Sequence, residues 1–270
     1  MMLHRSYGIQ EARPGGLFPP PVRVNERRML TLYTLPGAWG MPSISPFCTK
    51  LETWLRMTGL AFEARGPGSR RAPKGKLPFV VLEDGQQLGD SQLILEHLTA
   101  RQGVTLDAWL TPAQRATGRA LRRMLEEATY FCLAYERWVL TEGWGIYRHA
   151  FRALLPPVVR EVGPGLIRRG MRKALHAQGT GRHSAAEVHA MGLADMEVVA
   201  QQLGTQPFLF GEQPSSVDAV AFAFVDGFLS VPIRSPAHNF VSAHPRLRDY
   251  HARIRERWYP RGPALPQLRW

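Results

Sequence analysis

Residues 77–91, LPFVVLEDGQQLGDS, decide the fold of this chain. Leu77-Pro78 opens a short apolar run, Asp84-Gly85 follows it, and residues 86–88 lead back to Asp90-Ser91. An Asp-Gly pair between two β-prone runs is a strong hairpin signal. Aspartate and serine are both preferred at helix N-termini, and an apolar helical pattern follows them here. The stretch therefore predicts a β-hairpin that leads directly into a helix.

The segment before this hairpin predicts a β-α-β unit. Residues 29–35 are an apolar, β-prone run, and a loop rich in glycine and proline follows them. Ser45 suits a helix cap, Pro46 suits the first helical turn, and Gly59 suits the helix end. Residues 61–65 then form a second short strand. The order β-α-β-β-β-α predicts a small mixed sheet, because the crossover pairs parallel strands and the hairpin pairs antiparallel ones.

The second half of the chain predicts helices alone, since β signals nearly vanish after about residue 111. We expect helices over 112–140, 146–178, 184–203, 215–229 and 245–258, with a break in the second near Pro156-Pro157 and residues 163–165. The fold class is thus α/β followed by all-α. We divide the chain into an extended arm over 1–28, an α/β domain over 29–103 and a helical domain over 111–260.

Two positions in the helical part have capping-box spacing. Ser184 with Glu187, and Ser215 with Asp218, each place a serine three residues before a carboxylate. In such a box the serine bonds forward and the carboxylate reaches back to the cap. We therefore interpret Asp218 as structural, and His183 as a contact at a helix start.

Composition excludes several classes of protein. Cys48 and Cys132 are the only cysteines, which rules out a disulfide scaffold and a cysteine-based structural zinc site, so no metal is expected. The net charge of +12 comes mostly from arginines spread through helical stretches, and we interpret it as a compositional bias. Nucleic-acid binding around Arg160, Arg168, Arg169, Arg172 and Lys173 would rest on charge alone, so no nucleic-acid partner is expected.

The sequence pattern predicts neither a membrane span nor a secretion signal. No stretch resembles a membrane span of about 20 apolar residues, and the best candidate, residues 217–233, is interrupted by Asp218, Asp226 and Pro232. The N-terminus lacks the apolar core of a secretion signal. We therefore expect a cytoplasmic protein without an integral membrane segment.

Three short features of the α/β unit carry candidate chemistry, and the first is Ser45-Pro46-Phe47-Cys48 at a helix start. The free N–H groups and positive partial charge of a helix N-terminus stabilise a thiolate there. Ser45 is the first candidate for a hydroxyl that donates to a bound thiolate. Cys48 is the competing catalytic candidate, because a cysteine at such a position is itself a low-pKa nucleophile. A simple serine cap with a buried cysteine explains the motif as well, and Tyr33 is a further candidate donor.

The other two features suit the rest of a thiol peptide. In the thioredoxin fold the bond equivalent to Leu77-Pro78 is cis, which turns the preceding backbone N–H and C=O toward a peptide substrate. Only about one X-Pro bond in twenty is cis, so a purely structural proline stays an alternative. The Ser91 hydroxyl and N–H suit a carboxylate and Asp90 suits an ammonium, although an ordinary helix cap also explains this pair. A γ-glutamyl group carries both charges on one carbon, so together the three features predict glutathione.

These motifs resemble a known family. The front half is similar to the N-terminal domain of glutathione transferases, and residues 45–57 and 73–79 are similar to its failed-axon-connections and metaxin-like branch. Residues 178–184, 207–211 and 215–219 resemble the same branch, so the resemblance covers roughly 29–258. It implies a thioredoxin-like N-terminal domain followed by an all-helical, glutathione-transferase-type C-terminal domain.

The resemblance also implies an activity and its residues. Glutathione would be the co-substrate, held by Lys76, Leu77, Pro78, Asp90 and Ser91, with its thiol at Ser45 or Cys48. The transferase would conjugate the thiolate to a small hydrophobic electrophile, or use it to reduce one, as in detoxification. A homodimer stays open. The metaxin-like relatives imply the alternative, a non-catalytic interaction or adaptor protein of the same fold.

Two points of the resemblance stay open. The loop over 36–44 is longer than in typical transferases, which leaves the register of Ser43, Ser45 and Cys48 against the thiol undecided. A second substrate would bind between the domains, where aromatic side chains gather. The candidates for that lining, at least half of which core packing explains as well, are Tyr130, Phe131, Tyr135, Trp138 and Trp144.

Overall fold

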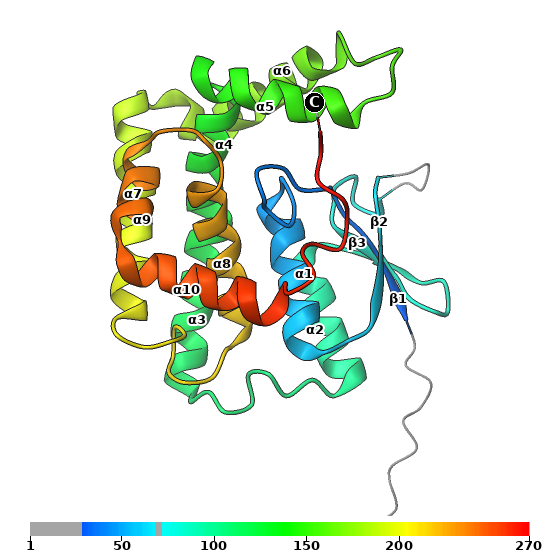
Figure 1. Cartoon of the computed structure of the whole chain (residues 1–270), viewed down its shortest axis with the longest axis vertical. Coiled ribbons are helices and arrows are strands. Elements are labelled where there is room, and N and C mark those ends of the chain that lie inside the picture. Colours follow the sequence, from blue (N-terminus) through cyan, green and yellow to red (C-terminus); the bar gives the residue numbers. More distant parts are fainter. Residues whose placement is uncertain (1–28, 68–71, 270) are drawn as a thin grey trace, which may run out of the picture.

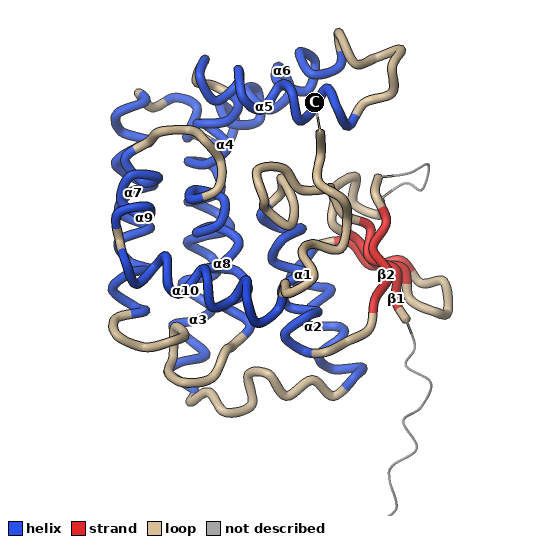
Figure 2. Tube along the Cα trace, in the orientation of Figure 1, coloured by secondary structure: helices blue, strands red, loops and turns tan. Residues whose placement is uncertain are grey.

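The front of the chain is a four-stranded mixed sheet with two helices. The computed structural model describes residues 29–67 and 72–269, so the predicted arm over 1–28 lies outside the described residues. The strands, red in Figure 2, are β1 (Leu30–Tyr33), β2 (Phe62–Arg65), β3 (Phe79–Val81) and β4 (Gln87–Gly89). Their order in the sheet is β2-β1-β3-β4. β1 pairs parallel with β2, and the other pairs are antiparallel. The predicted mixed sheet is therefore confirmed.

The first hairpin strand, predicted over 78–83, is shorter in the structure, and the return strand, predicted over 86–88, is shifted by one residue. Pro78 has no N–H to give to a ladder, so β3 begins one residue later. Beyond Val81 the chain already belongs to the turn, because the Leu82 N–H donates to the Gln86 carbonyl at 2.9 Å and the Gly85 N–H donates to the Leu82 carbonyl at 2.9 Å. The return strand ends at Gly89 and not at residue 88.

Helices α1 (Pro46–Thr58) and α2 (Ser91–Gln102) cover the sheet (Figure 1). Their apolar side chains pack on those of the strands in one cluster that includes Leu32, Trp54 and Ile94. α1 ends at Gly59, whose φ of 69° is in the left-handed region that glycine enters without steric cost. Both helices thus start at the end of the sheet where the candidate residues lie.

The rest of the chain is helical, as predicted, but with more interruptions. The helices are α3 (Pro112–Met124), α4 (Tyr130–Trp138), α5 (Thr141–Leu154), α6 (Gly163–Gln178), α7 (Ala185–Leu203), α8 (Ser216–Leu229), α9 (Pro236–Ala243) and α10 (Pro245–Trp258). A π-helical turn, η1 (Leu125–Thr129), joins α3 to α4, and a 3-10 turn, η2 (Thr180–Arg182), precedes α7. The predicted break near Pro156-Pro157 separates α5 from α6, whereas α9 was not predicted.

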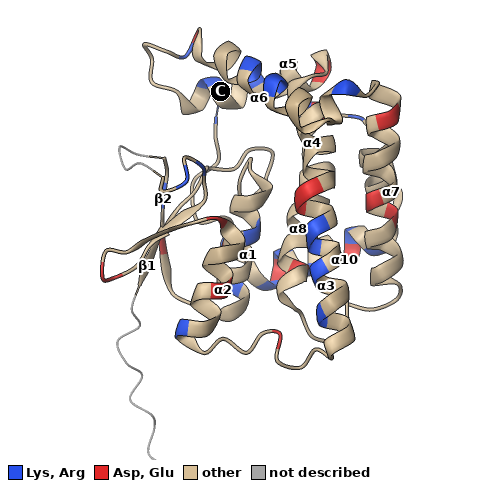
Figure 3. Ribbon diagram, turned by 180° about the vertical axis from the view of Figure 1, so that it is seen from behind, with Lys and Arg blue, Asp and Glu red and all other residues tan. Residues whose placement is uncertain are grey.

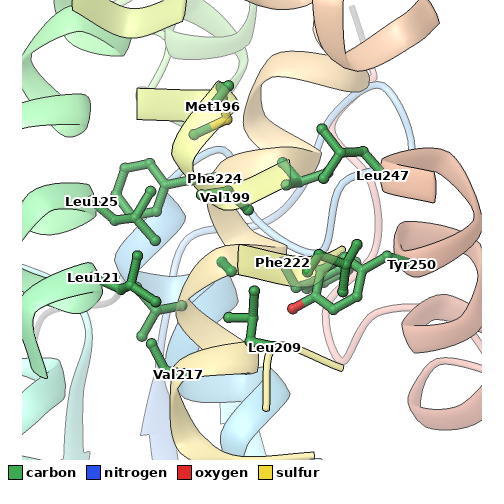
Figure 4. Close-up of a cluster of buried hydrophobic side chains, with 14 of the residues drawn as sticks. Leu121, Leu125, Met196, Val199, Leu209, Val217, Phe222, Phe224, Leu247 and Tyr250 are labelled. Atoms are coloured by element: carbon green, nitrogen blue, oxygen red, sulfur yellow. The ribbon is translucent and has the colours of Figure 1, made fainter. Parts of the chain in front are cut away.

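α8 is the centre of the helical part and joins it to the sheet domain. Twelve of its residues are buried, and it packs against α1 as well as α3 and α10. Figure 4 shows its phenylalanines Phe222 and Phe224 between side chains of the neighbouring helices, such as Leu125 and Tyr250. The indole N–H of Trp54 on α1 donates to the Ser216 hydroxyl at 3.2 Å, so the two parts are also joined by a polar contact.

Both predicted capping boxes are confirmed. In the box that starts α8, the Asp218 Oδ2 accepts from the Ser215 N–H at 2.8 Å. The fully buried carboxylate also accepts from the Leu209 N–H at 2.9 Å and from the Tyr250 hydroxyl at 3.2 Å. In the box that starts α7, the Ser184 N–H donates to Glu187 Oε2 at 2.8 Å on the surface. Asp218 therefore ties together three segments.

Candidate functional site

The sheet register brings the three predicted features to one end of the sheet. Tyr33 on β1 pairs with Phe79 on β3, and Phe79 pairs with Gly89 on β4. The residues just beyond this row therefore lie next to one another. Pro78 and Asp90 are two of these residues, and the third part is the start of the loop that leads from β1 to Ser45. Features separated by 45 positions along the chain, from Ser45 to Asp90, thus share one edge.

Ser45 and Cys48 differ sharply in their surroundings. Ser45 is the N-cap of α1, and its side chain is half-buried and makes no capping bond to the helix. Cys48 is fully buried. Burial raises the pKa of the Cys48 thiol, and hydrogen bonds with Thr34, Ser45 and Ser43 oppose that rise only in part. At neutral pH Cys48 is therefore a neutral thiol, whereas the Ser45 hydroxyl is free of the helix ladder.

The Leu77-Pro78 peptide bond is cis, as predicted. Pro78 is buried and Leu77 is half-buried, while the Lys76 side chain is exposed just before them. Leu77 precedes β3, and within the described part of the chain its N–H and carbonyl pair with no other backbone group. A polar backbone of this kind is a ready partner for an extended peptide.

Asp90 and Ser91 form the start of α2, and Asp90 adopts an unusual backbone. Its φ of 82° is in the left-handed region, which costs a non-glycine residue of order 1 kcal/mol. Asp90 Oδ1 accepts from the Gln92 N–H at 2.9 Å and from the Leu93 N–H at 3.1 Å, so the predicted cap exists. Its side chain is otherwise exposed, while Ser91 is 6% exposed. The cap therefore leaves the second carboxylate oxygen, Oδ2, facing solvent.

A buried lysine that the sequence reasoning missed connects both ends of this edge. The Lys50 ammonium on α1 donates to Glu126 Oε1 at 2.5 Å and to Gln92 Oε1 at 2.9 Å. Arg122 donates to the other oxygen of Glu126 at 2.9 Å. Burial lowers the Lys50 pKa, which the charge of Glu126 opposes. The signal in the sequence that could have pointed to this pair is a lysine within the same helical stretch as the apolar Leu51 and Trp54.

The π-helical turn is what brings Glu126 to this lysine. Its backbone is wider than an α-helix, and single π turns are frequent at functional sites. Glu126 is 7% exposed and Thr129 is fully buried, where its hydroxyl donates to Asp195 Oδ2 at 2.6 Å. The turn thus directs two polar residues inward, one of them toward the start of α1.

The loop before Ser45 is held by the C-terminal segment, which the sequence reasoning did not connect to the site. The Leu268 N–H donates to the Gly37 carbonyl at 2.7 Å. The Gln267 side chain accepts from the Gly40 N–H at 3.0 Å and donates to the Met41 carbonyl at 2.9 Å. In Figure 1 the red C-terminal segment runs beside this loop. Residues at the two ends of the described chain thus shape one edge of the site.

The expected aromatic lining is only partly accessible. Tyr135 and Trp138 are each 7% exposed and belong to the core beneath α5 and α6. Tyr130, Phe131 and Trp144 are half-buried. Tyr130 starts α4, and its ring lies 4.9 Å from that of Phe47 in the first turn of α1. Tyr33, the further candidate donor, is 7% exposed and stacks on Phe79 at 4.4 Å.

The described residues form neither a metal-binding cluster nor a membrane-spanning helix. No group of three or more His, Cys, Asp or Glu side chains there is arranged to hold a metal ion. None of the described helices combines the length and the apolar character that crossing a bilayer requires.

Comparison with known proteins gives a consistent result. Residues 46–143 match the glutathione S-transferase N-terminal domain, and residues 192–254 match the C-terminal domain. An isoprene-epoxide–glutathione S-transferase from Rhodococcus sp. (strain AD45) is 33% identical over 85% of this chain and 99% of its own. The Drosophila melanogaster protein Failed axon connections is 31% identical over 90% of this chain and 62% of its own.

Two further matches extend this pattern. Metaxin-1 from Macaca fascicularis is 25% identical over 82% of this chain and 71% of its own. Among solved structures, a glutathione S-transferase from Methylobacterium radiotolerans in complex with glutathione sulfonate has a TM-score of 0.57 and 15% identity, covering 90% of this chain and 98% of its own. The relatives support the predicted branch, and the solved structure supports the fold.

Proposed function

The chain belongs to the glutathione S-transferase family, and from this premise we propose that it binds glutathione and transfers the glutathione thiolate to a small electrophile. One observation carries the proposal: the sheet row Tyr33–Phe79–Gly89 aligns a helix start, a cis-proline and an Asp-Ser helix cap along a single edge. Each of these groups suits a different part of the glutathione tripeptide. We include in the proposal a cytoplasmic location, a detoxifying role and a homodimer.

The thiol lies at the start of α1 in this proposal. A free thiol has a pKa near about 8.5, so at neutral pH most of it is protonated and unreactive. The N–H groups of the first turn and the Ser45 hydroxyl donate to the sulfur and favour its anionic form. The buried, neutral Cys48 supports Ser45 over Cys48 as the donor. A pKa lowered by about two units corresponds to roughly 2.7 kcal/mol in favour of the thiolate.

The peptide part of glutathione pairs with the unpaired Leu77 backbone, and Lys76 is available for the terminal carboxylate. The γ-glutamyl end lies at the start of α2. There the Ser91 hydroxyl and N–H receive its carboxylate, and the solvent-facing oxygen of Asp90 receives its ammonium. Lys50 is a positioning residue, because its contacts with Gln92 and Glu126 fix the start of α2 relative to α1.

The electrophile approaches the sulfur from the helical side, where Phe47 and Tyr130 form an aromatic pair. The relative from Rhodococcus is named for an isoprene epoxide, so we propose small, apolar epoxides as the first substrate class to test. The thiolate attacks one ring carbon, the carbon–oxygen bond breaks, and the alkoxide takes a proton from water. The products are a thioether and an alcohol, which balances the reaction.

A second candidate function is a non-catalytic interaction protein of the same fold. The matches to Metaxin-1 and to Failed axon connections favour it, since neither name states a transfer reaction. An adaptor needs no ammonium-binding carboxylate, so the solvent-facing oxygen of Asp90, beside the buried Ser91, supports the transferase over this candidate.

Calorimetric titration with glutathione tests the proposal. We expect binding in the millimolar range or tighter, and weakening of about tenfold in Ser91→Ala, which removes one hydrogen bond to a charged group. Ser184→Ala is the matched control, because Ser184 also lies at a helix start, but at the surface start of α7. No binding heat at millimolar glutathione would refute the transferase and favour the adaptor. Binding without turnover of an epoxide or an aryl halide would refute conjugation while retaining the binding site.

A further inference from the structure

The α5–α6 hairpin projects from one end of the molecule. α5 and α6 lie across the top of the helical part in Figure 1, and the turn that joins them is its outermost part. α5 is anchored below by Tyr147 and Ala150, which are 1% and 0% exposed. α6 is anchored by Arg168, which donates to the Trp138 and Val139 carbonyls at 2.9 and 3.0 Å. These contacts anchor the hairpin on its inner side, and the residues of its outer face are exposed.

That outer face carries the most exposed apolar side chains of the described chain. Val158 in the turn is 94% exposed, and Val162 and Leu166 are each 66% exposed. Val162, Leu166, Arg169 and Lys173 follow one another at intervals of four, three and four residues, which places them on one face of α6. The core side chains Pro164 and Leu175 belong to the opposite face. Neighbouring exposed aliphatic side chains on one face of an anchored helix indicate a surface that meets a partner.

The same element has a strong positive charge. Residues 141–178 contain seven Lys and Arg against two Glu, a net +5 out of the chain's +12. One of the two glutamates, Glu161, is already paired with Arg152. Arg169, Arg172 and Lys173 are exposed and bond to no described residue. Arg168, Arg169 and Arg172 line an open cavity of about 350 Å³ over Gly165, and Figure 3 shows Lys and Arg on both helices.

We propose that this outer face, which we call the hairpin patch, docks on the surface of an anionic lipid bilayer. The patch consists of Val158, Val162, Leu166, Arg169, Arg172 and Lys173. The aliphatic side chains enter the boundary between headgroups and acyl chains, and the basic side chains bind the anionic headgroups. One phosphate fits the cavity between Arg168, Arg169 and Arg172.

Two properties favour a bilayer over other anionic partners. Nucleic acid matches the arginines but leaves the row of Val158, Val162 and Leu166 without a partner, since it is bound through polar and stacking contacts. A folded acidic protein would need a groove to receive a projecting turn, whereas a bilayer accepts a convex one. The inference does not depend on glutathione, because the patch shares no residue with the proposed site.

Vesicle flotation with the full-length protein tests this proposal. We expect binding to phosphatidylcholine vesicles that contain about one third phosphatidylglycerol, and little binding to phosphatidylcholine alone. The variant Arg169→Gln/Arg172→Gln/Lys173→Gln should bind the anionic vesicles on the order of 100-fold more weakly. Val162→Ser/Leu166→Ser should weaken binding about 10-fold without changing charge.

Matched controls remove the same groups elsewhere. Arg119→Gln/Arg246→Gln/Arg248→Gln removes three other exposed charges, and Met191→Ser/Val198→Ser removes two apolar side chains that are each 40% exposed on α7. Both controls should bind vesicles like the unmodified chain. Equal loss in a control and its patch variant would overturn the proposal, as would absence of binding to anionic vesicles. Unchanged binding in Val162→Ser/Leu166→Ser, together with equally tight binding of a DNA duplex, would replace it with a nucleic-acid surface.

Discussion

Ser45 and Cys48 lie one helical turn apart, but the Ser45 hydroxyl and the Cys48 thiol lie in different surroundings and therefore differ in the chemistry they can perform. Cys48 is fully buried, and burial favours its neutral form. Ser45 is half-buried at the end of the helix where N–H groups are unpaired. A side chain that contacts a bound thiol must be accessible, as Ser45 is at the helix start, and not fully buried, as Cys48 is.

The first prediction follows from this contrast. Ser45→Ala should lower kcat/KM for glutathione conjugation about 100-fold at neutral pH, the usual loss for one donor to a developing anion. The pH–rate profile should shift upward, because the bound thiol returns toward a pKa of about 8.5. Cys48→Ala should keep the rate and its pH profile. The reverse pattern, with Cys48→Ala inactive and Ser45→Ala active, would assign the thiol to Cys48.

Glu136 on α4 yields a prediction about pH and stability. The side chain is 3% exposed, and burial raises its pKa from 4.5 to about 7, against the smaller opposing effects of Ser235 and Arg137. Between these two pH values the folded chain keeps a proton that the unfolded chain has lost. The free energy of unfolding therefore falls as pH rises through this window and levels off above it.

Glu136→Gln should remove that slope. We expect the variant to gain up to about 3 kcal/mol over the unmodified chain above neutral pH, and nothing below the unfolded pKa. Urea unfolding at several pH values measures this directly, since glutamine retains a partner for Ser235. Parallel pH curves for the two proteins would show that Glu136 is ionised in the folded state.

At the scale of elements, the two capping boxes allow a direct comparison, because the same motif occurs once in the core and once on the surface. Asp218→Ala should cost about 4 kcal/mol of unfolding free energy, since it leaves the buried Leu209 and Ser215 N–H groups and the Ser215 hydroxyl without their acceptor. Ser184→Ala should cost only about 1 kcal/mol. Similar losses in chemical denaturation would contradict a joining role for Asp218.

The link between α1 and the π-helical turn is testable in the same way. Lys50→Met should cost about 3 kcal/mol of unfolding free energy, because it removes one partner of a buried charge. Arg123→Met is the matched control. Both side chains of the Arg123–Glu127 pair are more than half exposed, so this pair contributes at most about 0.5 kcal/mol. Lys50→Met should also weaken glutathione binding, whereas the control should not. Equal glutathione affinity in the two variants would remove the positioning role of Lys50.

Sequence patterns predicted the elements best where the signal is local. Asp84-Gly85, the Ser45-Pro46 helix start and the two capping boxes each act within four residues, and each appears in the structure. α9 was missed because it has only eight residues and begins after Pro232 and Ser235 in a stretch with no clear apolar period. The π turn was missed because its wider backbone depends on the packing of Glu126 and Thr129 against distant partners.

Across the whole molecule, the candidate site was predictable only in the part built from neighbouring strands. The positions of Ser45, Leu77 and Ser91 follow from sheet order. The Lys50–Glu126 pair, separated by 76 positions, and the C-terminal contacts of the loop over 36–44 do not, because nothing local specifies a partner so far along the chain. These long-range contacts determine how rigid the site is.

The C-terminal segment leads to the final prediction. Gln267 bonds to Gly40 and Met41 across more than 220 positions and thereby holds the loop that precedes Ser45. Gln267→Ala should speed amide hydrogen exchange in this loop and lower kcat/KM about tenfold, since a looser loop positions Ser45 less often. Arg269→Ala, two residues away and exposed, should change neither. Faster exchange with unchanged kcat/KM would mean that the loop does not control the thiol, and that the start of α1 alone holds Ser45 in place.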